Sequence, residues 1–397
     1  MPVDRLAGLV RGALPAGEAI GIALSGGGDS TALLHLALAA GLRVEAVTVD
    51  HGLRAESAAE AAAVAAACVG LGVPHAVMVW EHGPVSGNLM DAARRARMGL
   101  ILAWARGRGL AHVALGHTRD DQAETVLMGL ARKAGLAGLS GMRRSWSEGG
   151  VTLHRPLLGA SRAELRGWLT ARGIGWIDDP TNEDARFARS RARKALVALG
   201  PLGITAEGLA GVAANLAEAQ EALAVQVRAA AAASVQPVAG ALRIGDALWQ
   251  VPAEVRRQVI LRALGWLTGA DYAPRAAEVE RLMAAMREGR DATLAGCRFR
   301  KGWLMREARA LGPPSPVGGL WDGRWRVTGP AGEVRALGAE GLRQRKGWRD
   351  AGLPRSVLEV TPGVWQGETL VSAPLAGWPN GWSAQLDAGD HLFRLSD

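Results

Sequence analysis

The first 135 residues alternate between short apolar runs and longer segments whose apolar residues recur at helical spacing. The short runs predict buried strands, and the longer segments predict amphipathic helices. The strands are predicted at 19–25, 43–50, 74–80 and 111–116, and the helices at 31–41, 56–72, 89–109 and 121–135. This order predicts an α/β fold with a parallel, Rossmann-like sheet covered by helices on both faces. Ligands of such folds bind beyond the carboxyl ends of the strands.

The rest of the chain follows a different pattern. An Ala-rich run at 205–234 predicts one long helix, 240–250 a strand, 252–269 and 273–289 two amphipathic helices, and 291–309 a β-hairpin. The segment 311–319 is rich in Pro and Gly and is typical of a linker, and short strands follow it. We therefore expect an α/β domain at 1–200, a helical connector at 201–235, and two smaller α+β domains at 236–312 and 313–397.

Composition narrows the class of protein. The chain has 397 residues, 49% of them hydrophobic, which is enough for several cores. Its formal net charge of +8 favours a polyanionic partner, nucleic acid first. Its two cysteines, Cys68 and Cys297, lack the spacing of a zinc site or a redox pair, which favours a reduced, cytoplasmic location. No apolar run has the length of a signal peptide core or a membrane span, so we expect no membrane association.

A glycine-rich segment, SGGGDS, follows the first predicted strand. Glycines leave backbone N–H groups open to an anion, and the helix that begins there adds its positive end. The segment lacks the lysine and spacing of a GxxxxGK[ST] loop and is not GxGxxG. Asp29 suits a Mg²⁺ ligand or an orienter of the loop, and the alternative is a plain turn with an Asp/Ser helix cap. The candidate ATP-binding residues are Ser25, Gly26, Gly27, Gly28, Asp29 and Ser30.

A cluster of acidic residues, GHTRDDQAET, follows the fourth predicted strand. His117, Asp120, Asp121 and Glu124 gather where that strand ends and a helix begins. Asp121 and Glu124 are three residues apart and therefore share one helical face. Carboxylates this close favour a metal, a cation or a shared proton. The alternative is an acidic first turn that satisfies the helix dipole, with Asp120 as the N-cap.

Two weaker patterns also lie near predicted strand ends. Asp50 and His51 follow the second strand in VDHGLR, where a histidine is more often a turn residue. Arg94 and Arg97 lie one turn apart on the third helix, where they either grip an anion or form a solvated basic face.

A dense basic stretch ends the first predicted domain. Five basic residues follow an Asp-Asp-Pro turn: Arg186, Arg189, Arg191, Arg193 and Lys194. This density favours contact with a phosphate backbone, and a solvated basic helix is the alternative.

Together these segments resemble the N-type ATP pyrophosphatases, the PP-loop superfamily, whose phosphate loop has the form SGGxDS. Within that group their order closely resembles the tRNA(Ile)-lysidine synthetase family. The matching segments cover most of residues 20–197: ALSGGGDSTALLHL, VDHGLR, AARRAR, LGHTRDDQAETVLMGL, RKAGLAGLSGM, RPLL and WIDDPTNEDARFARSRAR. The tail from GWRDAGLPR onward also resembles the last domain of that family.

The resemblance implies an ATP-dependent ligase that forms a carbon–nitrogen bond. Such an enzyme attaches L-lysine to the wobble cytidine of the CAU anticodon of tRNA(Ile), through an adenylated cytidine, and releases AMP and diphosphate. ATP and Mg²⁺ would be its cofactors, with the metal near Asp29. The implied catalytic residues are Asp29, His117, Asp121, Glu124, Arg94 and Arg97, with the lysine held by Asp121 and Glu124. His117 and Asp121 are the available bases or amine-positioning groups.

The two later domains are expected to hold the tRNA, and the enzyme to be a monomer or a homodimer. Arg256 and Arg257 of the middle domain and Arg345, Lys346 and Arg349 near the end join the basic stretch as candidate tRNA contacts. Where the family usually has other residues, this chain has Met90, Met98, Lys133 and Ser190, which puts fine contacts in doubt. A tRNA thiolase or an amide-forming ligase of the same superfamily remains the alternative.

Overall fold

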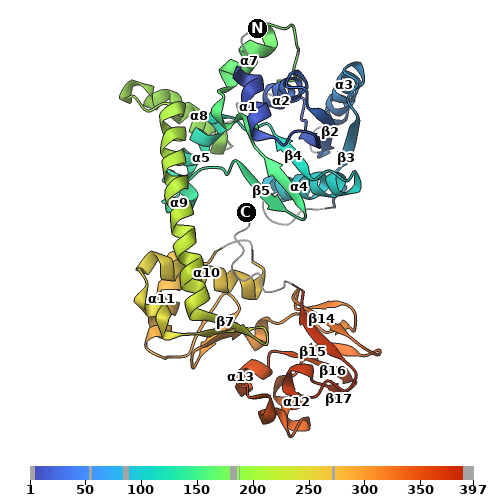
Figure 1. Ribbon diagram of the computed structural model, residues 1–397, viewed down its shortest axis with the longest axis vertical. Helices are drawn as coiled ribbons and strands as arrows, with labels where there is room; N and C mark the ends of the chain where they lie inside the picture. Colours follow the sequence, from blue (N-terminus) through green and yellow to red (C-terminus); the bar gives the residue numbers. More distant parts are fainter. Residues whose placement is uncertain are drawn as a thin grey trace. The chain divides into compact units, whose positions relative to one another are not determined.

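The computed structural model describes residues 5–52, 56–83, 89–178, 186, 188–270 and 273–387 (Figure 1). Two compact units make up the chain, the first reaching Glu221 and the second beginning at Ala222. The first unit contains the strands β1 (Ala19–Ala23), β2 (Arg43–Asp50), β3 (His75–Val79), β4 (His112–Leu115), β5 (Ser145–Glu148) and β6 (Val151–His154). Its helices include α1 (Arg5–Ala13), α2 (Gly28–Ala39), α3 (Ser57–Gly70), α4 (Leu89–Gly107), α5 (Arg119–Ala131), α6 (Leu136–Leu139), α7 (Arg162–Thr170) and α8 (Ala188–Leu199).

The strands of the first unit form one sheet in the order β3-β2-β1-β4-β6-β5. Neighbours from β3 to β6 are parallel, and β5 is antiparallel to β6. The predicted parallel sheet is confirmed, and the β5–β6 hairpin extends it beyond the four strands that the sequence pattern predicted. The chain order reverses between β1 and β4, which is the switch point where ligands of α/β sheets bind.

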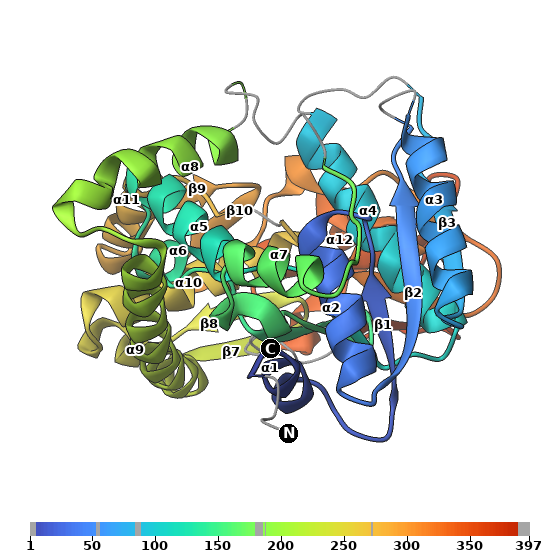
Figure 2. The ribbon, with the colours of Figure 1, turned by 90° about the horizontal axis from the view of Figure 1, so that it is seen from above.

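Alternate strand residues face opposite sides of this sheet. Ile20 and Ile22 of β1 are fully buried in a core that includes residues of α1, α2, α3 and α7. Val113 and Leu115 of β4 lie in a second core with Ile101 of α4. Burial of each such side chain stabilises the fold by about 2 kcal/mol. Figure 2 shows β1 and β2 side by side among these helices. The predicted helices on both faces are therefore confirmed.

The helix α9 (Ala206–Ser234) lies where the long Ala-rich helix was predicted, and it runs across the boundary between the units. After it come β7 (Val235–Val238), β8 (Ala241–Ile244), α10 (Ala253–Thr268), α11 (Ala276–Arg287), β9 (Ala292–Leu294), β10 (Cys297–Arg300) and β11 (Trp303–Arg306). The strands form an antiparallel sheet in the order β7-β8-β11-β10-β9. The predicted hairpin at 291–309 is wrong in one respect, because three strands lie there rather than two.

Short elements form the end of the second unit. They are β12 (Ser315–Pro316), β13 (Leu320–Trp321), β14 (Trp325–Thr328), β15 (Glu333–Ala336), α12 (Gly338–Gln344), α13 (Arg355–Leu358), β16 (Pro362–Gln366), β17 (Thr369–Ser372) and β18 (Ser383–Leu386). They build two sheets, β12-β15-β16-β17 and β13-β14-β18. The segment predicted as a linker therefore contributes β12.

Side chains connect the two predicted domains inside the second unit. Arg306 of β11 forms two hydrogen bonds to Asp322, at 2.9 and 3.0 Å. The Arg324 guanidinium lies 4.6 Å from the ring centre of Trp266 and donates to the carbonyl of Gly240 at 3.1 Å. These contacts give the middle and last segments a shared packing surface.

Among the residues described, no single helix is long and apolar enough to cross a bilayer. One pair of helices at 188–202 and 206–234, bent by 100° at the break between them, passes the same length and composition test together, as core helices also do.

Candidate active site

The glycine loop, residues Ser25–Ser30, joins β1 to the first turn of α2. Because α2 begins at Gly28, its first backbone N–H groups have no helical partner and are available to an anion. The Ser30 hydroxyl donates to the carbonyl of Gly27 at 3.0 Å and accepts the Ser25 N–H at 3.1 Å. Ser30 therefore holds the loop closed, and the loop presents an anion site at the switch point of the sheet.

Two glycines allow the loop to fit against its neighbours. Gly26 has a φ of +81°, and a Cβ there would lie 2.8 Å from Ile177 and from Val64. Gly116 follows β4, and a Cβ there would lie 3.0 Å from the backbone nitrogen of Ser30 and 3.1 Å from the carbonyl carbon of Asp29. The end of β4 thus rests directly on the first turn of α2, which brings the glycine loop and the acidic cluster together.

The acidic cluster is fixed by the start of α5. Thr118 is its N-cap and accepts the Asp121 N–H at 3.3 Å, while Asp121 Oδ2 accepts both the N–H and the hydroxyl of Thr118 at 2.8 Å. The alternative with Asp120 as the N-cap is wrong, because Asp120 lies inside the helix and accepts the Arg162 N–H at 2.8 Å. The side chains of Asp121 and Glu124 are 9% and 1% exposed, so both charges need partners inside the protein.

Arg162 supplies the main partner, and it was not among the residues predicted for the site from the sequence. Its guanidinium lies 3.1 Å from Asp29, 3.3 Å from Asp121 and 3.4 Å from Glu124. One cation therefore joins the glycine loop to both carboxylates of α5. Its backbone begins α7, where Ser161 and Glu164 form a capping box that fixes the direction of the helix. That local S-x-x-E pattern is readable from the sequence, but the contact with Asp29, 133 residues away, is not.

The carboxylates respond differently to this environment. Burial raises the pKa of Asp29 above its ordinary value, and Arg162 opposes that rise only in part. Burial also raises the pKa of Asp121, but Arg162 and the Thr118 N–H outweigh it and hold that pKa below the ordinary value. Two buried oxygens, Asp29 Oδ1 and Glu124 Oε2, have no hydrogen-bond partner among the described residues. They are the open acceptor positions of the site.

His117 lies on the cationic side of the same site. Its Nδ1 accepts a hydrogen bond of 3.2 Å from Nε of Arg155, whose guanidinium also donates to the carbonyl of Arg143 and lies 4.1 Å from the ring centre of Trp146. Burial and the charges of Arg155 and Arg97 lower the pKa of His117 to about 3, against the opposing effect of Asp121. The imidazole is therefore neutral near pH 7.

Several guanidinium groups gather around His117. Burial lowers the pKa of Arg97, and the charges of Arg94 and Arg189 lower it further. Burial, Arg94 and Arg189 likewise lower the pKa of Arg155 to about 10. In the described part of the chain, neither Arg94 nor Arg97 has a carboxylate within ion-pair distance. Like charges held this close favour a bound anion.

The basic stretch divides into two sets. Arg189 and Arg193, four residues apart on α8, face the carboxylates: Arg189 lies 3.6 Å from Asp121 and Arg193 lies 3.0 Å from Glu124. Arg186, Arg191 and Lys194 are exposed instead. All five were predicted to contact tRNA, but Arg189 and Arg193 lie in the carboxylate cluster.

The candidate tRNA residues of the second unit differ in exposure. Arg256 lies over Trp249, and Arg257 pairs with Glu254 at 2.6 Å. Arg345 is half-buried and donates to the carbonyl of Gly377, whereas Lys346 and Arg349 are exposed. Arg349 also lies 4.6 Å from the ring centre of Trp348.

Three of the four residues at which this chain departs from the usual family pattern have well-defined surroundings. Lys133 follows the C-cap of α5 with a φ of +55°, a conformation that favours glycine. Ser190 is buried in α8, and Met98 packs against the α4 side of the sheet. Met90 is 53% exposed at the start of α4.

Neither cysteine is placed for sulfur transfer. Cys68 and Cys297 are both free and buried, and burial raises the pKa of the Cys297 thiol to about 12. Thiolate chemistry is thus disfavoured at both.

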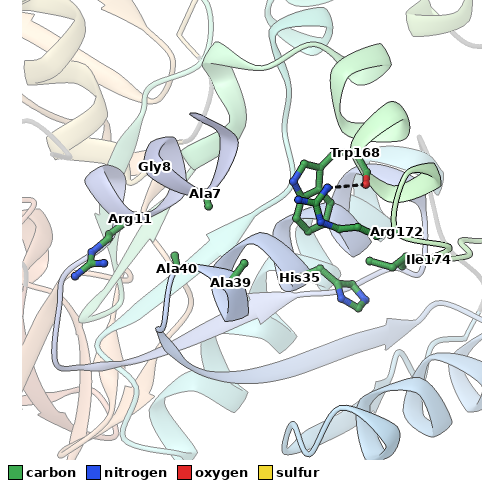
Figure 3. A pocket seen from close by; sticks show the side chains of 9 residues that line it. All are labelled: Ala7, Gly8, Arg11, His35, Ala39, Ala40, Trp168, Arg172 and Ile174. Atoms are coloured by element: carbon green, nitrogen blue, oxygen red, sulfur yellow. Dashed lines mark hydrogen bonds between the residues drawn. The ribbon is translucent and has the colours of Figure 1, made fainter. Parts of the chain in front are cut away.

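A separate hollow of about 480 Å³ lies among α1, α2 and α7, on the part of α2 farthest from the glycine loop (Figure 3). His35, Trp168 and Arg172 line it, and the Arg172 guanidinium lies 3.8 Å from the ring centre of Trp168. None of the candidate site residues lines it.

Comparison with known proteins gives independent information on the family of this chain. Residues 5–199 match the family model of the PP-loop domain. A tRNA(Ile)-lysidine synthase from Ruegeria pomeroyi is 45% identical over 95% of this chain and 93% of its own length. Two others, from Bradyrhizobium diazoefficiens and Rhizobium meliloti, are 42% and 37% identical and cover 69% and 85% of this chain and 79% of their own lengths.

The U34-tRNA thiolase NcsA from Methanococcus maripaludis is 16% identical, covers 56% of this chain and 79% of its own, and gives a TM-score of 0.46.

Proposed function

Because this chain belongs to the tRNA(Ile)-lysidine synthase family, we propose that the glycine loop and the acidic cluster of the first unit form its active site. There it joins L-lysine to the wobble cytidine of the CAU anticodon of tRNA(Ile). In the first step the C2 oxygen of cytidine attacks the α-phosphorus of ATP, and diphosphate leaves. In the second, the ε-amine of lysine attacks C2, and AMP leaves with that oxygen. The contact of the glycine loop with the acidic cluster through Gly116 and Arg162 carries the proposal, because a phosphate held by the loop and an amine held by the carboxylates would then be neighbours.

The glycine loop binds the diphosphate end of ATP. Its N–H groups face the anion, and Arg94 and Arg97 neutralise the charge that develops as diphosphate departs. Phosphoryl transfer needs positioning and charge neutralisation more than covalent help, which is what this loop and these arginines supply.

The residues present also fit a magnesium ion. Asp29 Oδ1 is buried without a hydrogen-bond partner in the described structure, and carboxylate oxygen is the donor that Mg²⁺ prefers. Mg²⁺ is commonly bound through one or two carboxylates together with substrate phosphates, and Asp29 would supply the carboxylate here. When bound, Mg²⁺ screens the phosphate charge.

The substrate amine binds at the carboxylates of α5. Glu124 Oε2 is the open acceptor for an ammonium group, and Asp121 borders it. The attacking amine must be neutral, although a free lysine amine is protonated at pH 7. The charges of Arg162 and Arg193 beside Glu124 disfavour the ammonium form and so promote release of its proton to water.

His117 acts as a hydrogen-bond donor rather than as a base. An arginine keeps its protons, so the Arg155 Nε–H must donate and His117 Nδ1 must accept. A neutral ring with an accepting Nδ1 carries its proton on Nε2. His117 therefore presents an N–H to the oxygen atoms of the reactants.

The exposed basic residues bind the tRNA backbone. Arg186, Arg191 and Lys194 of the first unit and Lys346 and Arg349 of the second are exposed, as phosphate contacts must be. Substituting Lys346 and Arg349 together by alanine should weaken tRNA binding and reduce its salt dependence. An unchanged salt slope would contradict the assignment.

One assay tests the function. The full chain is incubated with ATP, labelled lysine and the CAU-anticodon tRNA, and in parallel with a sulfur donor or ammonia in place of lysine. Only lysine should enter the tRNA. Glu124→Gln should reduce the rate about 100-fold or more, because the amine loses its charged partner. The exposed Glu207→Gln on α9 is the control, and incorporation of sulfur or ammonia would overturn the assignment.

A further inference from the structure

Three rings gather where β2 and β3 end. His51 follows β2, and Trp80 and His82 follow β3. The rings of Trp80 and His82 are stacked with centres 4.0 Å apart and an interplanar angle of 33°, and the edge of the His51 ring meets Trp80 at 6.2 Å and 84°. The backbone N–H of Trp80 donates to the backbone carbonyl of Asp50 at 2.8 Å, which continues the β2–β3 pairing and holds the two strand ends side by side. We call these three residues the aromatic platform.

The platform borders the active site. The positive charge of Arg97 lowers the pKa of both His51 and His117, so its guanidinium lies near the platform and near His117. Parallel strands end at one edge of the sheet, which places the platform at the same edge as the glycine loop.

The platform is also accessible. His82 is exposed, and Trp80 and His51 are half-buried. Tryptophan side chains are usually well buried in folded proteins, so the exposure of Trp80 is unusual. His51 Nδ1 is buried without a hydrogen-bond partner among the described residues, so it is an open polar position beside the rings. The mechanism proposed above uses none of the three side chains.

We propose that the aromatic platform stacks on an unpaired base of the tRNA anticodon loop next to the wobble cytidine. The proposal rests on the proposed function, which requires that loop to enter this edge of the sheet. Unstacked RNA bases are bound on Trp and His faces in this way, with Arg beside them for the backbone. An exposed stack suits a base delivered by a large ligand, whereas small-ligand pockets enclose most of their ligand.

The test compares tRNA binding by the full-length wild type and by Trp80→Leu, which keeps an apolar side chain but removes the ring. Trp80→Leu should raise the Kd of the CAU-anticodon tRNA about 5- to 150-fold, the usual effect of losing one stacked base. Trp80→Phe should restore most of the affinity, because it restores an aromatic face. Transcripts with a single abasic site in the anticodon loop identify the stacked base: at one position the wild type loses affinity and Trp80→Leu does not.

Three controls make the result decisive. Trp168→Leu removes a tryptophan from the separate hollow and should leave tRNA binding unchanged. Circular dichroism checks that each variant is folded, and the exposed His82→Ala gives a second variant if Trp80→Leu is not. Unchanged tRNA affinity in Trp80→Leu, or a loss of ATP affinity alone, overturns the proposal. Lysine incorporation by the wild type tests the proposed function separately.

Discussion

His117 should remain neutral far below the pH at which an ordinary histidine becomes charged. Burial, Arg155 and Arg97 lower its pKa to about 3, with Asp121 opposing and Arg189 adding to the effect. As the pH falls below 6.5 the unfolded chain therefore takes up a proton at this residue while the folded chain does not. The contribution of His117 to the free energy of unfolding is fully present above pH 6.5, and it is lost progressively as the pH falls from 6.5 toward 3.

The size of the loss follows from the difference between the two pKa values. Each pH unit between them costs about 1.4 kcal/mol, so acidification from pH 7 to pH 5 should lower the free energy of unfolding by about 2 kcal/mol through His117. His117→Gln removes this contribution. Urea unfolding at both pH values should thus show a smaller loss in His117→Gln than in the wild type.

¹⁵N-labelled histidine gives a direct measurement in the folded protein, which has 8 histidines. The signal absent from His117→Gln should report a neutral ring with its proton on Nε2 at pH 5. Arg155→Met removes a positive charge and the Nδ1 donor, so it should raise the pKa of His117. A His117 signal that titrates near pH 6.5 in the wild type, or a proton on Nδ1, would refute the reasoning.

Three further predictions concern the structure around the site. Arg162→Ala leaves buried carboxylates without their shared cation and should lower the free energy of unfolding by about 3 kcal/mol, whereas Arg162→Lys should lower it less. Equal stability of the wild type and both variants in urea would contradict this. Gly116→Ala forces a Cβ to within 3.0 Å of Ser30 and should cost about 1–3 kcal/mol and weaken binding of an ATP analogue in calorimetry; normal ATP affinity would count against the contact. Lys133 has a left-handed backbone conformation, so Lys133→Gly should relieve its strain and raise the free energy of unfolding by about 1 kcal/mol. Lys133→Ala keeps that strain and should give no gain in urea unfolding, and a gain with alanine would contradict the explanation.

The sequence predicted the parts of the fold that depend on local pattern. β2 lies at Arg43–Asp50 as predicted, because its run of buried residues is bounded by polar ones. The start of α5 does not follow from local pattern alone: Thr118 and Asp120 are both good cap residues, and in the structure Thr118 caps the helix while Asp120 accepts the Arg162 N–H. The hairpin β5–β6 and the third strand of 291–309 are short and half exposed, so their periodicity is weak.

Long-range contacts account for the site residues that the sequence did not reveal. Arg162 and Arg155 belong to segments that look like an ordinary helix start and a short connection, and neither has a local sign of its partners. The division of the basic stretch was partly readable, since Arg189 and Arg193 share a helix face and Arg191 does not.

The close contact of Gly116 with the first turn of α2 bears on where the two chemical steps occur. Under the proposed function both chemical steps take place at this contact, so the activated base would have no distance to travel before the amine reaches it. The missing side chain at Gly116 is what lets the glycine loop and the end of β4 approach so closely.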